Sequence, residues 1–146
     1  MDYFHLKLNN EQLNQISTLG LAHIGDGVYE LMVRAWLVVH GKATNKGLHR
    51  ATIQYVSAQA QARQAEHIRC LLSEEEQAVF RRGRNSNPHT VSKAATREEY
   101  QTATALEALF GYLYLKGRID RLDELFEALM EEADPPAHTK EVGSCH

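Results

Sequence analysis

Cysteine, proline and long apolar runs are scarce in this chain. Its 146 residues include two cysteines and three prolines. Cys70 and Cys145 show no metal-ligand spacing, so we expect neither a zinc site nor a disulfide framework. We also expect the protein to work in a reducing cytosol. No apolar run approaches the roughly 18 residues that a membrane span requires, and the first residues lack the pattern of a signal peptide. These absences predict a soluble, unsecreted, cytoplasmic protein without a membrane partner.

Positive charge is also in short supply. The formal net charge is -3, with 43% hydrophobic and 24% charged residues, which are ordinary globular values. This balance excludes a protein that coats nucleic acid nonspecifically, so any RNA or DNA site must be a local patch. A chain of this length can form one core. We predict a single domain over residues 1–133 and a disordered tail over residues 134–146, which are mostly polar.

Apolar residues recur at helical spacing along most of the chain and predict an all-α fold, a helical bundle. The expected helices cover residues 10–19, 21–39, 48–72, a stretch that begins at 74, 98–116 and 119–133. Ser73 followed by Glu76 predicts a capping box at the start of the fourth of these helices. Beyond Phe80 the periodicity breaks, so residues 81–97 are expected to form a loop.

Residues 21–30 are unusual because they place a single carboxylate, Asp26, in an otherwise apolar helix. Gly25 and Gly27 flank it, and glycine is unfavourable in a helix interior. The pair therefore indicates that another backbone, a ligand or a metal comes close to this point. The alternative is that Gly-Asp-Gly forms a turn, with Asp26 as a helix N-cap.

Glu107 repeats this pattern in a second apolar helix, where it stands between Leu106 and Leu109. Burying an unpaired carboxylate costs several kcal/mol, so each acid is expected to find a cation, a donor or a metal. If the two helices pack together, Asp26 and Glu107 can lie side by side. Their mutual repulsion would then favour a divalent cation between them.

Positive charge is concentrated between residues 81 and 97. This stretch contains five cations with no acid between them, namely Arg81, Arg82, Arg84, Lys93 and Arg97. Asn85 is one of several additional hydrogen-bond donors in the same stretch. Such a group predicts phosphate binding, and its alternative is a solvated basic loop. Because no aromatic residue lies among the cations, the duplex backbone is a better ligand than stacked single strands. Lys46, His49 and Arg50 form a second candidate RNA surface.

Four short motifs resemble the ribonuclease III family. Residues 24–28 are similar to the core of its signature helix, and residues 106–111 to its second acidic helix. The resemblance is closer to the Mini-III subfamily, which lacks a double-stranded-RNA-binding domain. The shared motifs are Leu-Ala-x-Ile-Gly-Asp at 21–26, Val-Ser-Ala at 56–58, Arg-Gly-Arg-Asn at 82–85 and Glu-Ala-Leu-x-Gly-Tyr-Leu at 107–113.

This resemblance implies a ribonuclease III-type endonuclease domain that dimerises through its signature helices. It implies Mg²⁺-dependent cleavage of double-stranded RNA that leaves 5′-phosphate and 3′-hydroxyl ends, usually in the maturation of 23S ribosomal RNA precursor. A ribosomal protein that presents the RNA is a candidate partner. Asp26 and Glu107 match the two carboxylates that the subfamily keeps, whereas Ala22 and Thr104 stand where larger relatives have further acids.

Several alternatives remain open at this level. Glu30 shares a helix face with Asp26 and could hold a metal-bound water, but its spacing to Arg34 favours an ordinary ion pair. His23 and His49 fall in no metal-binding pattern. Two other functions would also fit parts of the chain: a nonenzymatic double-stranded-RNA or ribosome-binding module, and a helical scaffold for protein interactions.

Overall fold

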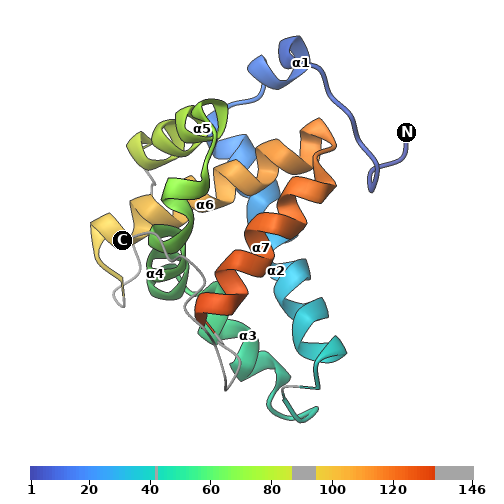
Figure 1. Ribbon diagram of the computed structural model, residues 1–146, viewed down its shortest axis with the longest axis vertical. Helices are drawn as coiled ribbons and strands as arrows, with labels where there is room; N and C mark the ends of the chain where they lie inside the picture. The colour runs from blue at the N-terminus through green and yellow to red at the C-terminus, as the bar shows by residue number, and fades with distance from the viewer. Residues whose placement is uncertain (42, 87–94, 134–146) are drawn as a thin grey trace.

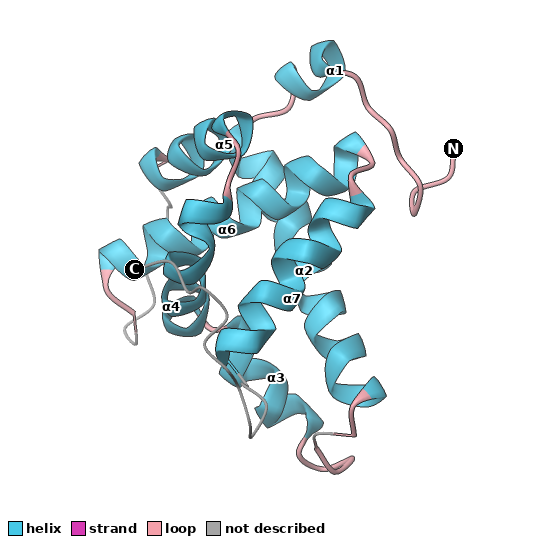
Figure 2. Ribbon diagram, viewed as in Figure 1, coloured by secondary structure: helices cyan, strands magenta, loops and turns pink. Residues whose placement is uncertain are grey.

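The computed structural model describes residues 1–41, 43–86 and 95–133, without the side chain of Glu132. All regular structure in these residues is helical, which confirms the predicted fold class (Figures 1 and 2). In chain order the elements are α1 (Asn10–Asn14), α2 (Thr18–Val39), α3 (Leu48–Val56), α4 (Ala58–Ile68), the 3₁₀ helix η1 (Arg69–Leu71), α5 (Glu74–Asn85), α6 (Arg97–Lys116) and α7 (Ile119–Ala133).

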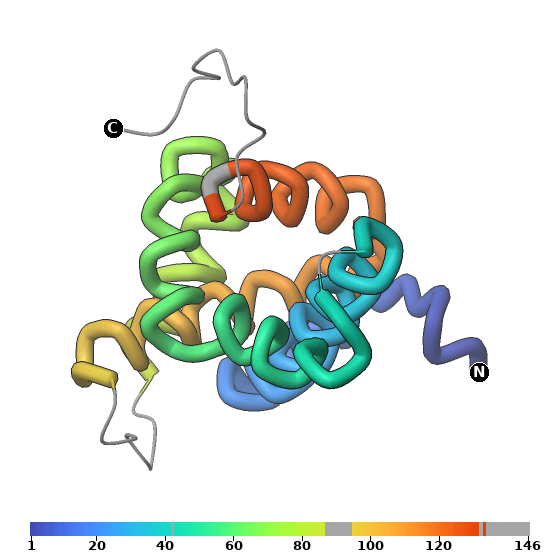
Figure 3. Tube along the Cα trace, turned by 90° about the horizontal axis from the view of Figure 1, so that it is seen from below, coloured from blue at the N-terminus to red at the C-terminus, as the bar shows by residue number. Residues whose placement is uncertain are grey.

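Helix α6 lies at the centre of the bundle. It packs against α2, α4, α5 and α7, and the view from below shows it between α2 and α7 (Figure 3). A helix that is apolar on all sides is expected in such a position. Every residue from Thr102 to Leu113 is buried except Glu107, which is only partly covered. The centre of the fold therefore has one break in its apolar surface, at a carboxylate.

Tyr29 of α2 contacts residues of four other helices. Its fully buried ring lies edge-on to Phe110 of α6 at 5.4 Å and to Phe126 of α7 at 6.2 Å. Its hydroxyl donates to Gln64 Oε1 on α4 and lies 3.3 Å from the carbonyl oxygen of Tyr55. Burial raises the pKa of this phenol above its ordinary range. Tyr29 is thus a packing residue.

Capping residues explain where the helices begin and end. The predicted capping box is confirmed, since Ser73 and Glu76 exchange side chain to backbone hydrogen bonds of 3.2 and 2.8 Å. Ser57 accepts the amide of Ala60 at 3.3 Å and starts α4. The single helix expected over residues 48–72 is therefore wrong, because this cap divides it into α3 and α4. Ser17 likewise starts α2 at Thr18, earlier than expected.

Two further expectations concern the cysteines and the tail. The sequence offered no reason to expect a disulfide, but Cys70 is disulfide-bonded, and the other cysteine, Cys145, lies outside the described residues. The predicted tail over residues 134–146 also lies outside them. None of the described helices combines the length and apolar character needed to cross a bilayer.

Candidate functional site

Helices α2 and α6 cross with their backbones in contact. A Cβ atom added to Gly25 would lie 1.6 Å from the carbonyl oxygen of Glu107, and one added to Gly111 would lie 1.9 Å from the carbonyl oxygen of Leu21. Only glycine leaves room for such an approach. The predicted close contact is confirmed for Gly25, and the approaching group is another backbone. Gly27 differs, because a Cβ atom there would meet nothing within 4 Å.

Asp26 and Glu107 meet at this crossing. Asp26 follows Gly25 within α2, so its interpretation as an N-cap in a turn is wrong. A side-chain hydrogen bond joins Asp26 to Glu107, which means that the two carboxyl groups share a proton. Burial, together with the charge of Asp26 and its hydrogen bond, raises the pKa of Glu107 to about 9. The carboxyl group of Glu107 therefore keeps its proton near neutral pH.

The composition of this pair suits a hard divalent cation. Both ligands are carboxylates, and Mg²⁺ binds oxygen ligands while keeping much of its water shell. Within residues 1–41, 43–86 and 95–133, no group of three or more His, Cys, Asp or Glu side chains could hold a metal. The protein thus offers two ligands here. Most of the shell of a bound ion would come from water and from a substrate.

The neighbouring positions add no third carboxylate. Glu30 lies 3.5 Å from Arg34, which confirms the ion-pair interpretation. Ala22 is buried, and the hydroxyl of Thr104 donates to the carbonyl oxygen of Tyr100 at 2.9 Å. His23 is exposed. The pair at the crossing stands alone on this part of α2 and α6.

The expected basic loop is only partly a loop. Helix α5 continues to Asn85, so Arg81, Arg82, Arg84 and Asn85 lie on its last turns, and Arg97 is the first residue of α6. The prediction of a loop from residue 81 is therefore wrong. Gly83 explains the continuation, because a Cβ atom there would lie 2.7 Å from Ala105 Cα, so the turn is packed tightly on α6. Lys93 lies outside the described residues.

The second basic group lies in a different part of the molecule. Lys46 precedes α3, and His49 and Arg50 belong to its first turn, with all three side chains exposed. The start of α3 lies at the lower end of the view in Figure 1, whereas α5 lies at the upper left. The two candidate RNA surfaces are therefore separate.

Sequence reasoning missed Arg69. This residue lies on η1, and it lines a cavity of about 670 Å³ together with Arg81 and Arg84 of α5. No spacing in the sequence connects Arg69 with the later arginines. Only the packing of η1 against α5 reveals their common cavity.

Comparison with known proteins decides the family. Residues 19–118 match the ribonuclease III domain. The chain belongs to the ribonuclease III family. It is an endoribonuclease of that family, and the predicted resemblance is confirmed.

Individual relatives agree with this assignment. The chain is 43% identical over 120 residues to a Mini-ribonuclease 3 of a Thermoanaerobacter species, covering 82% of this ribonuclease and 84% of the relative. It is 46% identical over 110 residues to the Mini-ribonuclease 3 of Symbiobacterium thermophilum, covering 75% and 85%. The crystal structure of a Fusobacterium nucleatum protein aligns with a TM-score of 0.73 and 30% identity, covering 80% of this chain and 89% of that one.

Proposed function

We propose that this endoribonuclease cleaves double-stranded RNA with Mg²⁺, and that Asp26 and Glu107 are its catalytic, metal-binding carboxylates. The observation that carries the proposal is the meeting of two carboxyl groups from different helices at a point where the backbones touch. Side chains held in this way are preorganised for a metal ion and a phosphate. Membership of the ribonuclease III family supports the reaction class.

The two carboxyl groups serve one metal ion in the proposed mechanism. Asp26 and Glu107 would hold the Mg²⁺ ion, which would supply Lewis-acid polarisation of the scissile phosphate and a lowered pKa for a water nucleophile. Glu107 gives up its shared proton so that both carboxylates can bind the ion. The contact between Gly25 and the Glu107 carbonyl group holds the separation of the two side chains. We expect products with 5′-phosphate and 3′-hydroxyl ends.

The basic residues supply the RNA contacts in this proposal. The residues that bind the duplex backbone lie between the end of α5 and the start of α6, and they are Arg81, Arg82, Arg84, Asn85, Lys93 and Arg97. Lys46, His49 and Arg50 form a second RNA surface. Arginine suits this task because its planar fork matches phosphate oxygens. The expected substrate in the cytoplasm is 23S ribosomal RNA precursor, presented by a ribosomal protein.

The proposed active form is a homodimer. The outer face of α2 is apolar, and Ile24, Val28 and Leu31 line a groove of about 400 Å³ together with Tyr114 and Ile119. Leu31 keeps 58% of its surface exposed, which is unusual for a leucine in the middle of a long helix. A two-fold axis along this face would bury the groove and provide one carboxylate pair for each RNA strand.

One assay tests the proposal. Purified protein is incubated with a long RNA duplex in the presence and absence of Mg²⁺. Cleavage that requires the metal supports the enzyme. Retention of the duplex without cleavage would instead identify a nonenzymatic RNA-binding module, and neither cleavage nor retention would identify a scaffold for protein interactions.

A further inference from the structure

A basic cleft lies between η1 and α5. Its volume is about 670 Å³, and three arginines line it, Arg69 from η1 and Arg81 and Arg84 from α5. Gln77 and Asn85 add side-chain amides, and no carboxylate lines it among the described residues. We name this feature the arginine cleft. In a chain of net charge -3, its concentration of positive charge indicates an anionic ligand.

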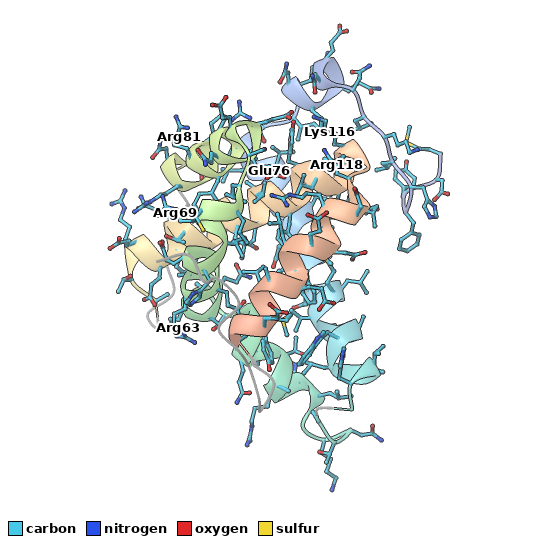
Figure 4. The ribbon with its side chains drawn as sticks, viewed as in Figure 1. Arg63, Arg69, Glu76, Arg81, Lys116 and Arg118 are labelled. Carbon is cyan, nitrogen blue, oxygen red and sulfur yellow. The ribbon has the colours of Figure 1, made fainter. Side chains whose placement is uncertain are left out.

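Packing holds the wall of the arginine cleft in place. The Arg69 guanidinium lies over the Phe80 ring, 5.3 Å from its centre, in a cation–π contact that fixes its direction. Arg69 and Arg81 come from two different elements and follow one another along the same edge of the molecule (Figure 4). The positive groups are therefore already gathered before a ligand binds.

The ion pairs at this cleft are weak enough to be exchanged. Arg69 pairs with Glu66 at 3.2 Å, and both side chains are at least 41% exposed. Arg84 pairs at 3.5 Å with Glu98, which is 79% exposed. Exposed pairs of this kind contribute about 0–1 kcal/mol. Arg81 has no ion-pair partner in the part of the chain that the structure describes.

The arginines of α5 fall on two sides of the helix. Arg81 and Arg84 are three residues apart and share the side that faces η1, whereas Arg82 does not line the cleft. The basic stretch that appears continuous in the sequence is thus divided in space. One part completes a cleft with Arg69, and the other part is available to a different portion of the RNA.

The cleft suits a phosphodiester backbone better than a base. Phe80 lies at its apolar wall with only 3% of its surface exposed, so its ring offers no free face on which a base could stack. Three guanidinium groups and two amides are all hydrogen-bond donors to phosphate oxygens. We propose that the arginine cleft binds backbone phosphates of the RNA substrate. This inference rests on the proposed function and adds a binding site that includes Arg69.

The test compares two double variants of the full chain. Arg69→Gln/Arg81→Gln removes two cleft charges. Lys7→Gln/Arg118→Gln removes the same charge elsewhere, and Arg118 lies beside the α6–α7 turn, away from the cleft (Figure 4). Binding to a fluorescent RNA duplex is measured by anisotropy without Mg²⁺, so that no cleavage occurs, over a series of salt concentrations.

The cleft variant should lower the log–log salt slope by about two, since each neutralised phosphate contributes roughly 0.9. Its affinity near 0.1 M salt should fall about tenfold or more. The control should keep the wild-type slope, and Arg69→Lys/Arg81→Lys should restore most of the slope because it keeps the charge.

The outcomes separate the two proposals. Thermal unfolding shows whether the loss of the contact between Arg69 and Phe80 disturbs the fold. If it does, Arg81→Glu alone replaces the double variant, and it should likewise lower the salt slope and the affinity for the duplex. Equal slopes for the cleft variant and the control would overturn the cleft and leave the proposed function intact. A wild-type protein that neither binds nor cleaves the duplex would overturn both.

Discussion

At the scale of single residues, one shared proton sets the behaviour of the candidate site. Glu107 holds it because burial and the neighbouring Asp26 both raise the pKa of its carboxyl group. A divalent cation must displace this proton before it can bind both carboxylates. Metal binding and proton release are therefore coupled, and the consequences can be measured separately in activity and in stability.

Replacing either carboxyl group should abolish cleavage. Asp26→Asn and Glu107→Gln keep the side-chain shape but lose the charge that holds the ion. We therefore expect the cleavage rate to fall by about a thousandfold or more. Because both acids serve one ion, the double variant should be little worse than either single one. Cleavage of an RNA duplex under single-turnover conditions measures this. Glu30→Gln is the matched control and should stay active; a wild-type rate in Asp26→Asn would contradict the assignment.

The metal-free protein should lose stability as the pH rises. The folded pKa of Glu107, about 9, exceeds its unfolded value of 4.5. Its contribution to stability is thus fully present below about 4.5 and is lost as the pH rises through about 9. Chemical unfolding in EDTA should show this decline for the wild type and a flatter profile for Glu107→Gln. Identical profiles for the two proteins would show that the proton is not held in the folded state.

The sequence pattern singled out Asp26 and Glu107 as candidate site residues, but it did not predict the raised pKa of Glu107. Asp26 and Glu107 stand out because apolar residues at helical spacing surround each of them. The pKa of Glu107 depends on how deeply α2 covers it, and no local pattern records this depth. Arg69 was missed for a similar reason, since its partners come from another element.

At the scale of elements, glycines decide how closely the helices approach. Gly25 and Gly111 bring α2 and α6 into backbone contact, and Gly83 seats the end of α5 on Ala105. These contacts place the carboxylates and carry α5 from Phe80, where the sequence predicted its end, to Asn85. The apolar pattern could not predict that extension, because Arg-Arg-Gly-Arg contributes no apolar side chain.

Two neighbouring glycines should respond differently to alanine. Gly25→Ala forces α2 away from the Glu107 carbonyl group, and we expect a loss of about 3 kcal/mol or more together with loss of cleavage. Gly27→Ala meets no atom within 4 Å and should instead stabilise the helix by about 0.5–1 kcal/mol. Denaturant unfolding compares the two variants. Equal effects would mean that the crossing does not depend on the missing Cβ atom.

A partly buried ion pair joins α5 to α7. Arg121 donates two hydrogen bonds of 2.9 Å to Glu76 and a third of 2.7 Å to the Leu71 carbonyl oxygen. The Glu76 side chain is only 7% exposed. Arg121→Met should destabilise the fold by about 3 kcal/mol, because it leaves a covered charge unpaired. Thermal unfolding measures the loss, and Arg121→Met/Glu76→Gln should recover part of it. No recovery would mean that packing, and not the unpaired charge, accounts for the loss.

At the scale of the whole molecule, the apolar face of α2 predicts a dimer. Light scattering should give twice the mass of one chain. Leu31→Glu places a charge on the exposed part of this face and should yield a folded monomer. A monomeric wild type at the concentration of the cleavage assay would remove the proposed interface.

The crossing of α2 and α6 also has a consequence for the order of synthesis. Asp26 leaves the ribosome long before Glu107, and it gains its partner only when α6 docks across α2. The proposed catalytic pair is thus assembled by a contact between the early and late parts of the chain, which local helix formation cannot supply. If the proposed assignment of Asp26 and Glu107 holds, a chain whose synthesis stops before α6 should not cleave RNA, because it lacks one of the two carboxylates.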